Sequence, residues 1–239
     1  MKLLVVITTI NPKQKMYKQS LKKLKSSITK AQQMYDKDEI KLLEYVDKKK
    51  NGIARIQNEI WSTCKLYDTI FIHDDMLVDK SWLSEYLYWI WIRKLEGGIF
   101  GTKLHFPNGL IQHFGGEIKY DGDAFHPDRG VIDVGQHSKP KEVGFVSYAG
   151  HYVKREVIDK IGGIDKKFIP YGYEDADHCM RAKRAGFKIW CLPTSAIHYE
   201  SFTVSKVFDL KKLLDRNREY FMKKHKLTKY TKMKLPIWI

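Results

Sequence analysis

The first 75 residues alternate between continuous apolar runs and segments whose apolar residues recur every three or four positions. The continuous runs cover residues 3–10, 40–46 and 69–72, a pattern typical of strands buried on both faces of a sheet. The periodic segments, residues 17–35 and 51–66, predict amphipathic helices. This strand, helix, strand, helix, strand order with short links predicts an α/β fold, a parallel Rossmann-like sheet flanked by helices.

The rest of the chain continues the alternation, with one long interruption. We predict helices over residues 81–94, 157–161 and 175–185, strands over 99–104 and 188–192, and a hairpin turn at Asn108-Gly109. Residues 120–144 are rich in Gly, Asp, His, Pro and Lys without periodicity, which predicts a long loop, and loops of this length are usually functional or disordered. Residues 206–226 predict a basic amphipathic helix.

Positive charge is concentrated in two flanking segments. The chain has 43 Lys and Arg against 28 Asp and Glu, a formal net charge of +15. Residues 13–50 hold 12 Lys and 5 acidic residues, residues 206–239 hold 11 Lys or Arg and 3 acidic residues, and residues 51–205 are almost neutral. Two interpretations stay open: peripheral contact of the flanks with an anionic membrane or substrate, and an ordinary solvated surface.

Length and cysteine content narrow the class of protein. At 239 residues the chain can form one full α/β core, and we favour a single compact unit. Three cysteines without C-x-x-C spacing indicate a reduced, cytoplasmic protein. The N-terminal apolar stretch is too short for a signal peptide, and no run approaches the roughly 18 apolar residues of a membrane span.

Polar side chains follow each of the first three predicted strands. Asn11, Asp47 and the adjacent pair Asp74 and Asp75 all lie at strand ends. In a parallel sheet these ends meet at one crevice, where ligands bind. Two adjacent carboxylates repel each other unless a cation neutralises them, and Mg²⁺ or Mn²⁺ suits such oxygen ligands. The alternative is that both aspartates cap a helix that starts near Ser81.

A second acidic cluster opens the predicted helix over residues 175–185. Glu174, Asp175 and Asp177 crowd its first turn, where the helix dipole stabilises ionised carboxylates. A carboxylate held there can act as a general base. The alternative is N-terminal capping by Asp175, with Arg181 as its ion-pair partner.

His198 ends a short apolar segment that follows Pro193. A lone histidine is often a structural residue. If the segment returns to the crevice, its imidazole completes a metal shell begun by Asp75. The residues alone leave both interpretations open.

Four motifs, in this order, resemble those of the family 2 glycosyltransferases of the GT-A fold. They are Asn51-Gly-x-x-Arg55-x-x-Asn58, IFIHDDM at residues 70–76, GGIDKKFIPYGYEDADHCMRAKRAGFKIW at residues 162–190, and His198. The similarity extends over about residues 3–225. The segment GTKLHFPNGLIQHFGG and the later FHPDRG are similar to the rhamnosyltransferase-like branch of that family.

The resemblance implies a chemistry and a set of roles. It implies a mixed, mainly parallel sheet and inverting transfer of a sugar, of the hexosyltransferase type, from a nucleoside diphosphate to an acceptor hydroxyl. By similarity Asp75 and His198 bind Mn²⁺ or Mg²⁺, Asp175 is the catalytic base, and Glu174 lies beside it on the acceptor side. The first aspartate of the family's D-x-D motif is His73 here, which weakens the expectation of a two-carboxylate metal clamp.

The resemblance also assigns residues to the two substrates. The donor-binding positions are Thr8, Asn11, Asp47, Asn51, Arg55 and Asp74. Acceptor-side or lid positions are His151, His126 and Arg129, and the loop over residues 120–144 is the expected lid. The donor base stays open between uridine, thymidine and guanosine.

The implied organisation is a catalytic GT-A domain over residues 1–205, followed by a basic amphipathic helix and tail over residues 206–239. Its nucleotide-sugar half covers about residues 1–100, and its acceptor half about 101–205. The expected partners are a UDP-, dTDP- or GDP-sugar and a glycan or glycolipid acceptor, with no nucleic acid. Two alternatives remain, a basic nucleic-acid-binding module and a catalytically inactive binding protein of the same fold. A nucleotidyltransferase is disfavoured because TTINPKQK lacks a glycine-rich phosphate loop.

Overall fold

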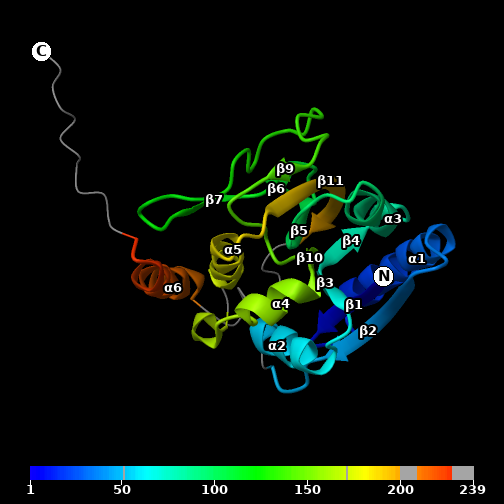
Figure 1. Cartoon of the computed structure of the whole chain (residues 1–239), viewed down its shortest axis with the longest axis horizontal. Helices are drawn as coiled ribbons and strands as arrows, with labels where there is room; N and C mark the ends of the chain where they lie inside the picture. Colours follow the sequence, from blue (N-terminus) through cyan, green and yellow to red (C-terminus); the bar gives the residue numbers. More distant parts are fainter. Residues whose placement is uncertain (51, 171, 200–208, 228–239) are drawn as a thin grey trace, which may run out of the picture.

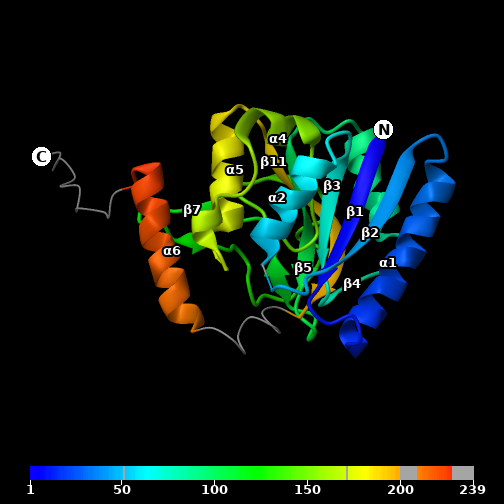
Figure 2. The same ribbon diagram turned by 90° about the horizontal axis from the view of Figure 1, so that it is seen from below.

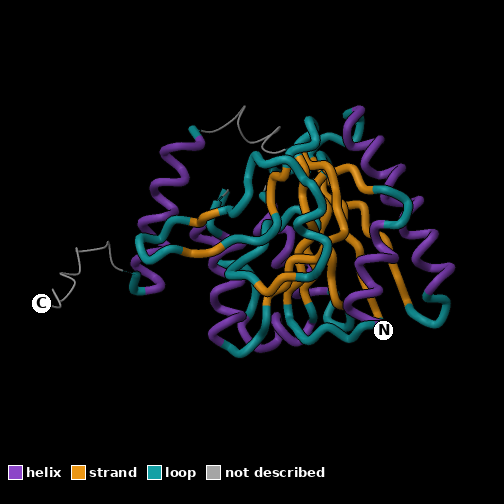
Figure 3. The backbone as a smooth tube through the Cα atoms, turned by 90° about the horizontal axis from the view of Figure 1, so that it is seen from above, coloured by secondary structure: helices purple, strands orange, loops and turns teal. Residues whose placement is uncertain are grey.

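A nine-stranded mixed sheet runs through the centre of the molecule (Figures 1 and 3). The computed structural model describes residues 1–50, 52–170, 172–199 and 209–227, and the strand count refers to these. Along the sheet the strands follow the order β2, β1, β3, β10, β5, β11, β4, with β6 paired to β5 and β9 paired to β11. The predicted donor residue Asn51 and the tail over residues 228–239 lie outside the described residues.

The elements have the following bounds. The strands of the central sheet are β1 (Lys2–Thr9), β2 (Glu39–Val46), β3 (Asp68–His73), β4 (Met76–Val78), β5 (Ile99–His105), β6 (Ile111–His113), β9 (Lys141–Glu142), β10 (His151–Val153) and β11 (Ile189–His198). A separate hairpin joins β7 (Glu117–Ile118) and β8 (Ala124–Phe125). The helices are α1 (Lys15–Met34), α2 (Ile53–Thr63), α3 (Trp82–Leu87), η1 (Tyr88–Ile92), α4 (Arg155–Ile161), η2 (Lys166–Phe168), α5 (Glu174–Arg184) and α6 (Leu210–His225).

The long strands of the sheet are parallel, as predicted. β1 pairs in parallel with β2 and with β3, and β5 pairs in parallel with β11. The short β10 is antiparallel to both β3 and β5, and so joins the two parallel groups. The sheet is therefore mixed and mainly parallel, with helices on both faces (Figure 2).

The alternation of side chains along β1 builds two hydrophobic layers. Leu3, Val5 and Ile7 pack with apolar side chains of α1 and α3 on one face of the sheet. Leu4 and Val6 pack with those of α2, α4 and α5 on the other. Successive side chains of a strand point to opposite faces, so a strand between two helical layers must be apolar throughout. This explains the continuous run at the start of the sequence.

The structure differs from the sequence prediction in its short or irregular elements. The helix predicted over residues 81–94 ends as an α-helix at Leu87 and continues as the π-helix η1. β11 passes through Pro193 and reaches His198, because a shift of register between Leu192 and Ser195 accommodates a residue without an N–H group. The strands β4, β6 and β10 were not predicted, because three residues are too few for a periodic pattern.

One buried carboxylate fastens α6 to α5. Asp177 is fully buried and accepts hydrogen bonds from Arg181 Nε at 2.9 Å, Lys224 Nζ at 2.6 Å and His225 Nε2 at 2.8 Å. Burial alone would raise the pKa of Asp177, but the hydrogen bonds from His225 and Lys224 outweigh it and lower the pKa to about 2. The C-terminal helix is therefore tied to the helix that carries the second acidic cluster.

α6 also contacts the loop that precedes α5. The buried Asn217 donates through Nδ2 to the carbonyl oxygens of Phe168, at 3.1 Å, and Gly172, at 2.8 Å. Gly172 has a φ of +96°, and a Cβ atom there would lie 2.6 Å from Leu214 Cδ2. Glycine is thus required at this position both by the backbone and by the closeness of α6.

The described parts of the two basic flanks lie far apart (Figures 1 and 2). α1, which carries many lysines of residues 13–50, and α6 lie at opposite ends of the molecule in both views (Figures 1 and 2). Within the described ranges, no helix combines the length and the apolar character needed to cross a bilayer. Contact of either flank with an anionic membrane stays a prediction.

Replacing Asp177 with alanine should lower the free energy of unfolding by about 3 kcal/mol, because the loss of this buried carboxylate removes the ion-pair partner of Arg181 and the acceptor of His225 Nε2, while Lys224 keeps Asp165. Urea unfolding followed by circular dichroism measures the loss. Asp159→Ala is the control: it removes a surface ion pair with Arg155, for which we expect a much smaller change. Equal losses in the two variants would contradict a stabilising role for the buried cluster.

Candidate functional site

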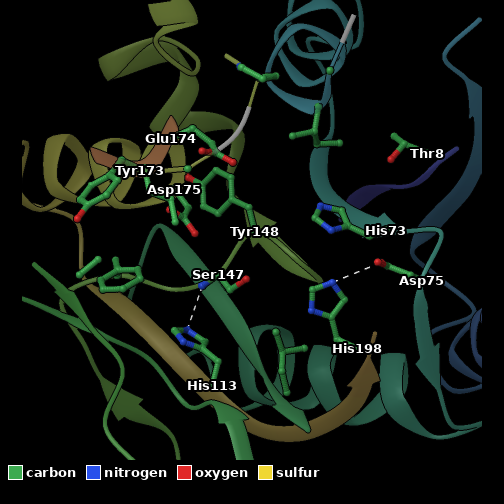
Figure 4. A pocket seen from close by; sticks show the side chains of 18 of the residues that line it. Thr8, His73, Asp75, His113, Ser147, Tyr148, Tyr173, Glu174, Asp175 and His198 are labelled. Carbon is green, nitrogen blue, oxygen red and sulfur yellow. Dashed lines mark hydrogen bonds and ion pairs between the residues drawn. The ribbon is translucent and has the colours of Figure 1, made fainter. Parts of the chain in front are cut away.

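A cavity of about 700 Å³ lies beyond the carboxyl ends of β1, β2 and β3 (Figure 4). Nine of the predicted site residues line it: Thr8, Asp47, Asp74, Asp75, His126, Arg129, Glu174, Asp175 and His198. Figure 4 shows His73, Asp75 and His198 on one side of the cavity and Glu174, Asp175 and Tyr148 on the other. The residues that end the third strand and those that open α5 therefore face one shared space.

Three side chains form a candidate cation site. One ligand atom each from His73, Asp75 and His198 lies within 4.8 Å of the other two. His198 Nε2 is 3.3 Å from Asp75 Oδ1, and the rings of His73 and His198 are 5.7 Å apart. A carboxylate and two imidazoles are ligands that divalent metals accept.

Strand pairing brings these residues together. β11 pairs with β4 so that His198 lies opposite Met76, the residue after Asp75, and Tyr199 N donates to Asp75 O at 3.1 Å. His73 ends β3, opposite Thr8 of β1. Backbone ladders, and not the side chains alone, thus set the geometry of the group.

Gln112 holds the ring of His198 in one orientation. His198 Nδ1 donates to Gln112 Oε1 at 2.8 Å, while Gln112 Nε2 donates to the carbonyl oxygen of His198 at 3.1 Å. The second bond fixes the amide orientation, so Nδ1 of His198 carries a proton and Nε2 is the ring nitrogen that faces Asp75. Gln112 lies in the motif GTKLHFPNGLIQHFGG, but no role for it was predicted from the sequence.

The donor atoms of the group fit a cation. His73 Nε2 is buried without a hydrogen-bond partner in the described part of the chain, and the buried Asp75 Oδ1 faces His198 Nε2 at 3.3 Å. Burial lowers the pKa of His73 to about 4, so its imidazole is neutral at pH 7, as a metal ligand must be. Burial raises the pKa of Asp75, but the His198 imidazole outweighs this effect and holds the carboxyl below its usual range.

The neighbouring Asp74 makes a different contact. Its Oδ2 accepts a hydrogen bond from Thr9 Oγ1 at 2.6 Å, and burial raises its pKa. The alternative that Asp74 and Asp75 cap α3 is wrong, because β4 separates them from that helix and none of the described side chains forms a capping hydrogen bond at its N-terminus.

Two adjacent carboxyl groups open α5 on the opposite wall. Asp175 Oδ1 accepts from Ala176 N at 2.7 Å, whereas Glu174 is buried and its Oε2 accepts no hydrogen bond from the described residues. Burial raises the pKa of both groups, and the charge of Asp175 raises the pKa of Glu174 further. The alternative ion pair between Asp175 and Arg181 is not formed, because Arg181 pairs with Asp177.

Tyr148 lies on the wall beside the carboxyl pair. Its hydroxyl is hydrogen-bonded to His178 Nδ1, and its ring stacks on His151 with centroids 3.6 Å apart. His151 is fully buried, is bonded through Nδ1 to Tyr148 O at 2.8 Å, and is not among the residues that line the cavity. The predicted acceptor-side residue His151 is therefore placed behind Tyr148.

The predicted lid segment is attached to the sheet at several points. Asp133 accepts from Lys103 Nζ at 2.7 Å and lies 2.8 Å from His105 Nε2, and Gly130 N donates to Ile111 O at 2.8 Å. The β7–β8 hairpin extends toward α6 (Figures 1 and 3). In this structure the segment forms a wall of the cavity, and its closure as a lid stays a prediction.

A chain of hydrogen bonds orients His126 within that wall. Ser147 N donates to His113 Nε2 at 3.0 Å, so His113 Nδ1 carries the proton and donates to His126 Nδ1 at 2.8 Å. Burial lowers the pKa of His113 well below its usual value, which keeps this ring neutral. Arg129 lies nearby and donates through Nη1 to Gln112 O at 3.2 Å.

The predicted donor residues divide into two groups. Asp47 lines the cavity: its Oδ2 accepts from Gly52 N at 3.1 Å, and its Oδ1 is buried without a partner in the described ranges. Asn11 and Arg55 are exposed and do not line the cavity. The cavity is also lined by residues that sequence reasoning did not select, among them Lys50, Gln112, His113, Ser147, Tyr148, Tyr173 and Arg218.

Comparisons with known proteins give partial matches in sequence. No family model matches the chain. The uncharacterized protein y4gI of Sinorhizobium fredii is 29% identical over 140 residues, or 54% of this chain. The O-antigen biosynthesis protein RfbC of Myxococcus xanthus is 33% identical over 140 residues, or 55% of this chain. The matches span only 15% and 11% of those two proteins.

Solved structures decide the fold. The chain is similar to GalNAc-T7 crystallised with UDP, GalNAc and Mn²⁺, with a TM-score of 0.57, 12% identity, and coverage of 82% of this chain and 43% of that one. It is also similar to S. aureus TarS 1–349 in complex with UDP-GlcNAc, with a TM-score of 0.56, 15% identity, and coverage of 93% and 66%. The chain has a GT-A glycosyltransferase fold. Membership of the rhamnosyltransferase-like branch stays a prediction.

Replacing Gln112 with methionine should lower the affinity of the cavity for Mn²⁺ by about 10- to 100-fold, because His198 loses the partner that orients its ring. Titration followed by electron paramagnetic resonance of free Mn²⁺ measures the change. Gln112→Glu keeps an acceptor for His198 Nδ1 and should retain more of the affinity. Gln136→Met, a change of an exposed glutamine that does not line the cavity, is the control. Unchanged Mn²⁺ affinity in a folded Gln112→Met variant contradicts the assigned role.

Proposed function

We propose that this chain is an inverting glycosyltransferase that moves a sugar from a nucleoside diphosphate to an acceptor hydroxyl. The observation that carries the proposal is the shared cavity, with the candidate cation group on one wall and the carboxyl pair Glu174 and Asp175 on the other. Displacement at an anomeric carbon needs charge stabilisation on the leaving diphosphate and proton removal on the opposite side. The GT-A fold supports this reaction class.

Asp75 and His198 are the proposed cation ligands, with Mn²⁺ or Mg²⁺ as the ion. When bound, the cation neutralises the negative charge that develops on the departing diphosphate. The buried His73 Nε2, which has no hydrogen-bond partner among the described residues, and the cluster that it forms with Asp75 and His198 support a cation in this place.

Asp175 is the proposed general base. It takes the proton of the acceptor hydroxyl as the acceptor oxygen forms a bond to the anomeric carbon. The bond from that carbon to the diphosphate oxygen breaks, and its electron pair leaves with the nucleoside diphosphate. Burial and the charge of Asp175 keep the proton on Glu174 at neutral pH, so the two neighbours divide into an ionised base and a neutral acid.

The nucleoside is proposed to bind near Thr8, Asp47 and Asp74, at the ends of the parallel strands. The unpartnered Asp47 Oδ1 offers an acceptor for a base N–H group or a ribose hydroxyl. Lys50, on the same side of the cavity, is a cation available to phosphate. Both similar structures were solved with uridine nucleotides, so UDP-sugars come first among UDP-, dTDP- and GDP-sugars.

The acceptor is proposed to be a glycan or glycolipid that lies against the wall of residues 120–144 and α6. His126, Arg129 and Arg218 offer hydrogen-bond donors there. The similarity to an O-antigen biosynthesis protein supports a role in polysaccharide synthesis. We propose a cytoplasmic site of action, with peripheral contact of a basic flank with an anionic membrane.

A thermal-shift screen of nucleotide sugars with Mn²⁺ tests donor binding. A ligand that binds only the folded chain raises the melting temperature, by mass action. We expect one class of nucleotide sugar to raise it in the presence of Mn²⁺, and Asp75→Ala to abolish the metal-dependent part of the shift. A folded chain that no nucleotide sugar stabilises contradicts the proposed function, and a donor that binds without any sugar transfer favours the inactive binding protein.

Asp175→Asn should lower the transfer rate by about 10²- to 10⁴-fold, because the amide cannot take a proton, while donor binding remains. Glu174→Gln is the matched variant: it resembles the protonated Glu174 side chain and should keep most of the rate. Radiolabelled sugar transfer measures both. Normal transfer by Asp175→Asn, or an equal loss in Glu174→Gln, contradicts the assignment.

The pH profile provides a separate test of the base. Asp175 must be ionised, and burial raises its pKa above the usual 3.8, so kcat/KM should fall as pH decreases through a value higher than 3.8. An acid limb at or below that value would contradict a buried base.

A further inference from the structure

We infer that His73 is a third ligand of the cation site, and that the resulting set of two imidazoles and one carboxylate selects a first-row transition-metal ion such as Mn²⁺ over Mg²⁺. The inference deepens the proposed function, since it rests on the same cation site, but it does not depend on sugar transfer. It departs from the two-carboxylate arrangement that the sequence motif leads one to expect.

The position of His73 supports direct ligation. It ends β3 two residues before Asp75, and one of its ligand atoms lies within 4.8 Å of those of Asp75 and His198. Its Nε2 is buried with no hydrogen-bond partner in the described part of the chain. A buried ring nitrogen without a partner costs free energy, and a cation at the centre of the group removes that cost.

The second carboxylate of the motif is engaged elsewhere. Asp74 Oδ2 accepts a hydrogen bond from Thr9 Oγ1 at 2.6 Å, and Asp74 is not part of the cluster of ligand atoms found in the described residues. Asp75 is thus the carboxylate of this group, and the nitrogen atoms of His73 and His198 are its other two ligand atoms. Two of the three protein ligand atoms in this group are therefore nitrogens.

This ligand set decides between the two ions. Mg²⁺ demands oxygen ligands in near-ideal octahedral geometry, whereas imidazole suits first-row transition metals. Gln112 adds to the difference, since it engages Nδ1 of His198 and so leaves Nε2 as the ring nitrogen that faces the group. Imidazole binds a metal as a neutral ligand, so two imidazoles and one carboxylate would leave a divalent ion with a net positive charge, which favours a diphosphate in the remaining positions.

Metal binding in the absence of any nucleotide sugar tests the inference. Mn²⁺ binding is titrated by electron paramagnetic resonance, with Mg²⁺ as the competitor, for the full chain and for His73→Asp. We expect the full chain to bind Mn²⁺ at least about tenfold more tightly than Mg²⁺, and His73→Asp to lose most of that preference by gaining affinity for Mg²⁺. His105→Gln, a histidine change outside the group, should leave the ratio unchanged.

Pulsed electron paramagnetic resonance of bound Mn²⁺ gives an independent readout, because it detects nitrogen nuclei bonded directly to the ion. The full chain should show coupling to two imidazole nitrogens, and His73→Asp coupling to one. Coupling to one nitrogen in both, or equal affinity of the full chain for Mn²⁺ and Mg²⁺, overturns the inference. Selective Mn²⁺ binding without sugar transfer would instead overturn only the proposed function.

Discussion

The pairing of β4 with β11 is the contact on which the cavity depends. It joins residues about 120 positions apart in the chain and sets His198 beside Asp75 through the backbone ladder. Without this short antiparallel pairing, β1, β2 and β3 would still form a parallel sheet. Asp74 and Asp75 at its carboxyl end would then lack the imidazole of His198, which comes from the second half of the chain. Gln112 of β6 then orients the ring of His198, which this pairing has placed beside Asp75. The proposed chemistry therefore relies on backbone geometry first and on side-chain contacts second.

The C-terminal helix has a larger part in the site than its separate position in the sequence indicates. Asp177 ties α6 to α5, and Asn217 binds the carbonyl groups of the loop just before the carboxyl pair. Leu214, Asp215 and Arg218 of α6 line the cavity directly. If the proposed function holds, a helix that encloses one side of the site can determine which acceptors fit, while the parallel strands on the other side hold the nucleotide.

Much of the fold is predictable from the sequence because its long elements carry clear periodicity. The runs that became β1, β2 and β3 and the amphipathic pattern of α1 and α2 are local signals, and the structure has them nearly as predicted. β4 and β10 are set by pairing with distant strands, and no local pattern encodes such pairing.

The same distinction between local and long-range signals applies to the candidate site. Asp75, Asp175 and His198 are recognisable by motif, whereas Gln112 gains its role only from its two bonds to a residue 86 positions away. His73 was interpreted as a departure from a motif, and its nearness to His198 could not be known from sequence.

Because β1 packs against a hydrophobic layer on each face of the sheet, it affects how the molecule unfolds. Its odd-numbered side chains belong to one hydrophobic layer and its even-numbered ones to the other, so neither layer can open without exposing half of the strand they share. The sheet also continues without a break across the expected border near residue 100, through β10. The parts of the chain before and after residue 100 are therefore coupled into a single cooperative unit, and heat should melt them together in one transition.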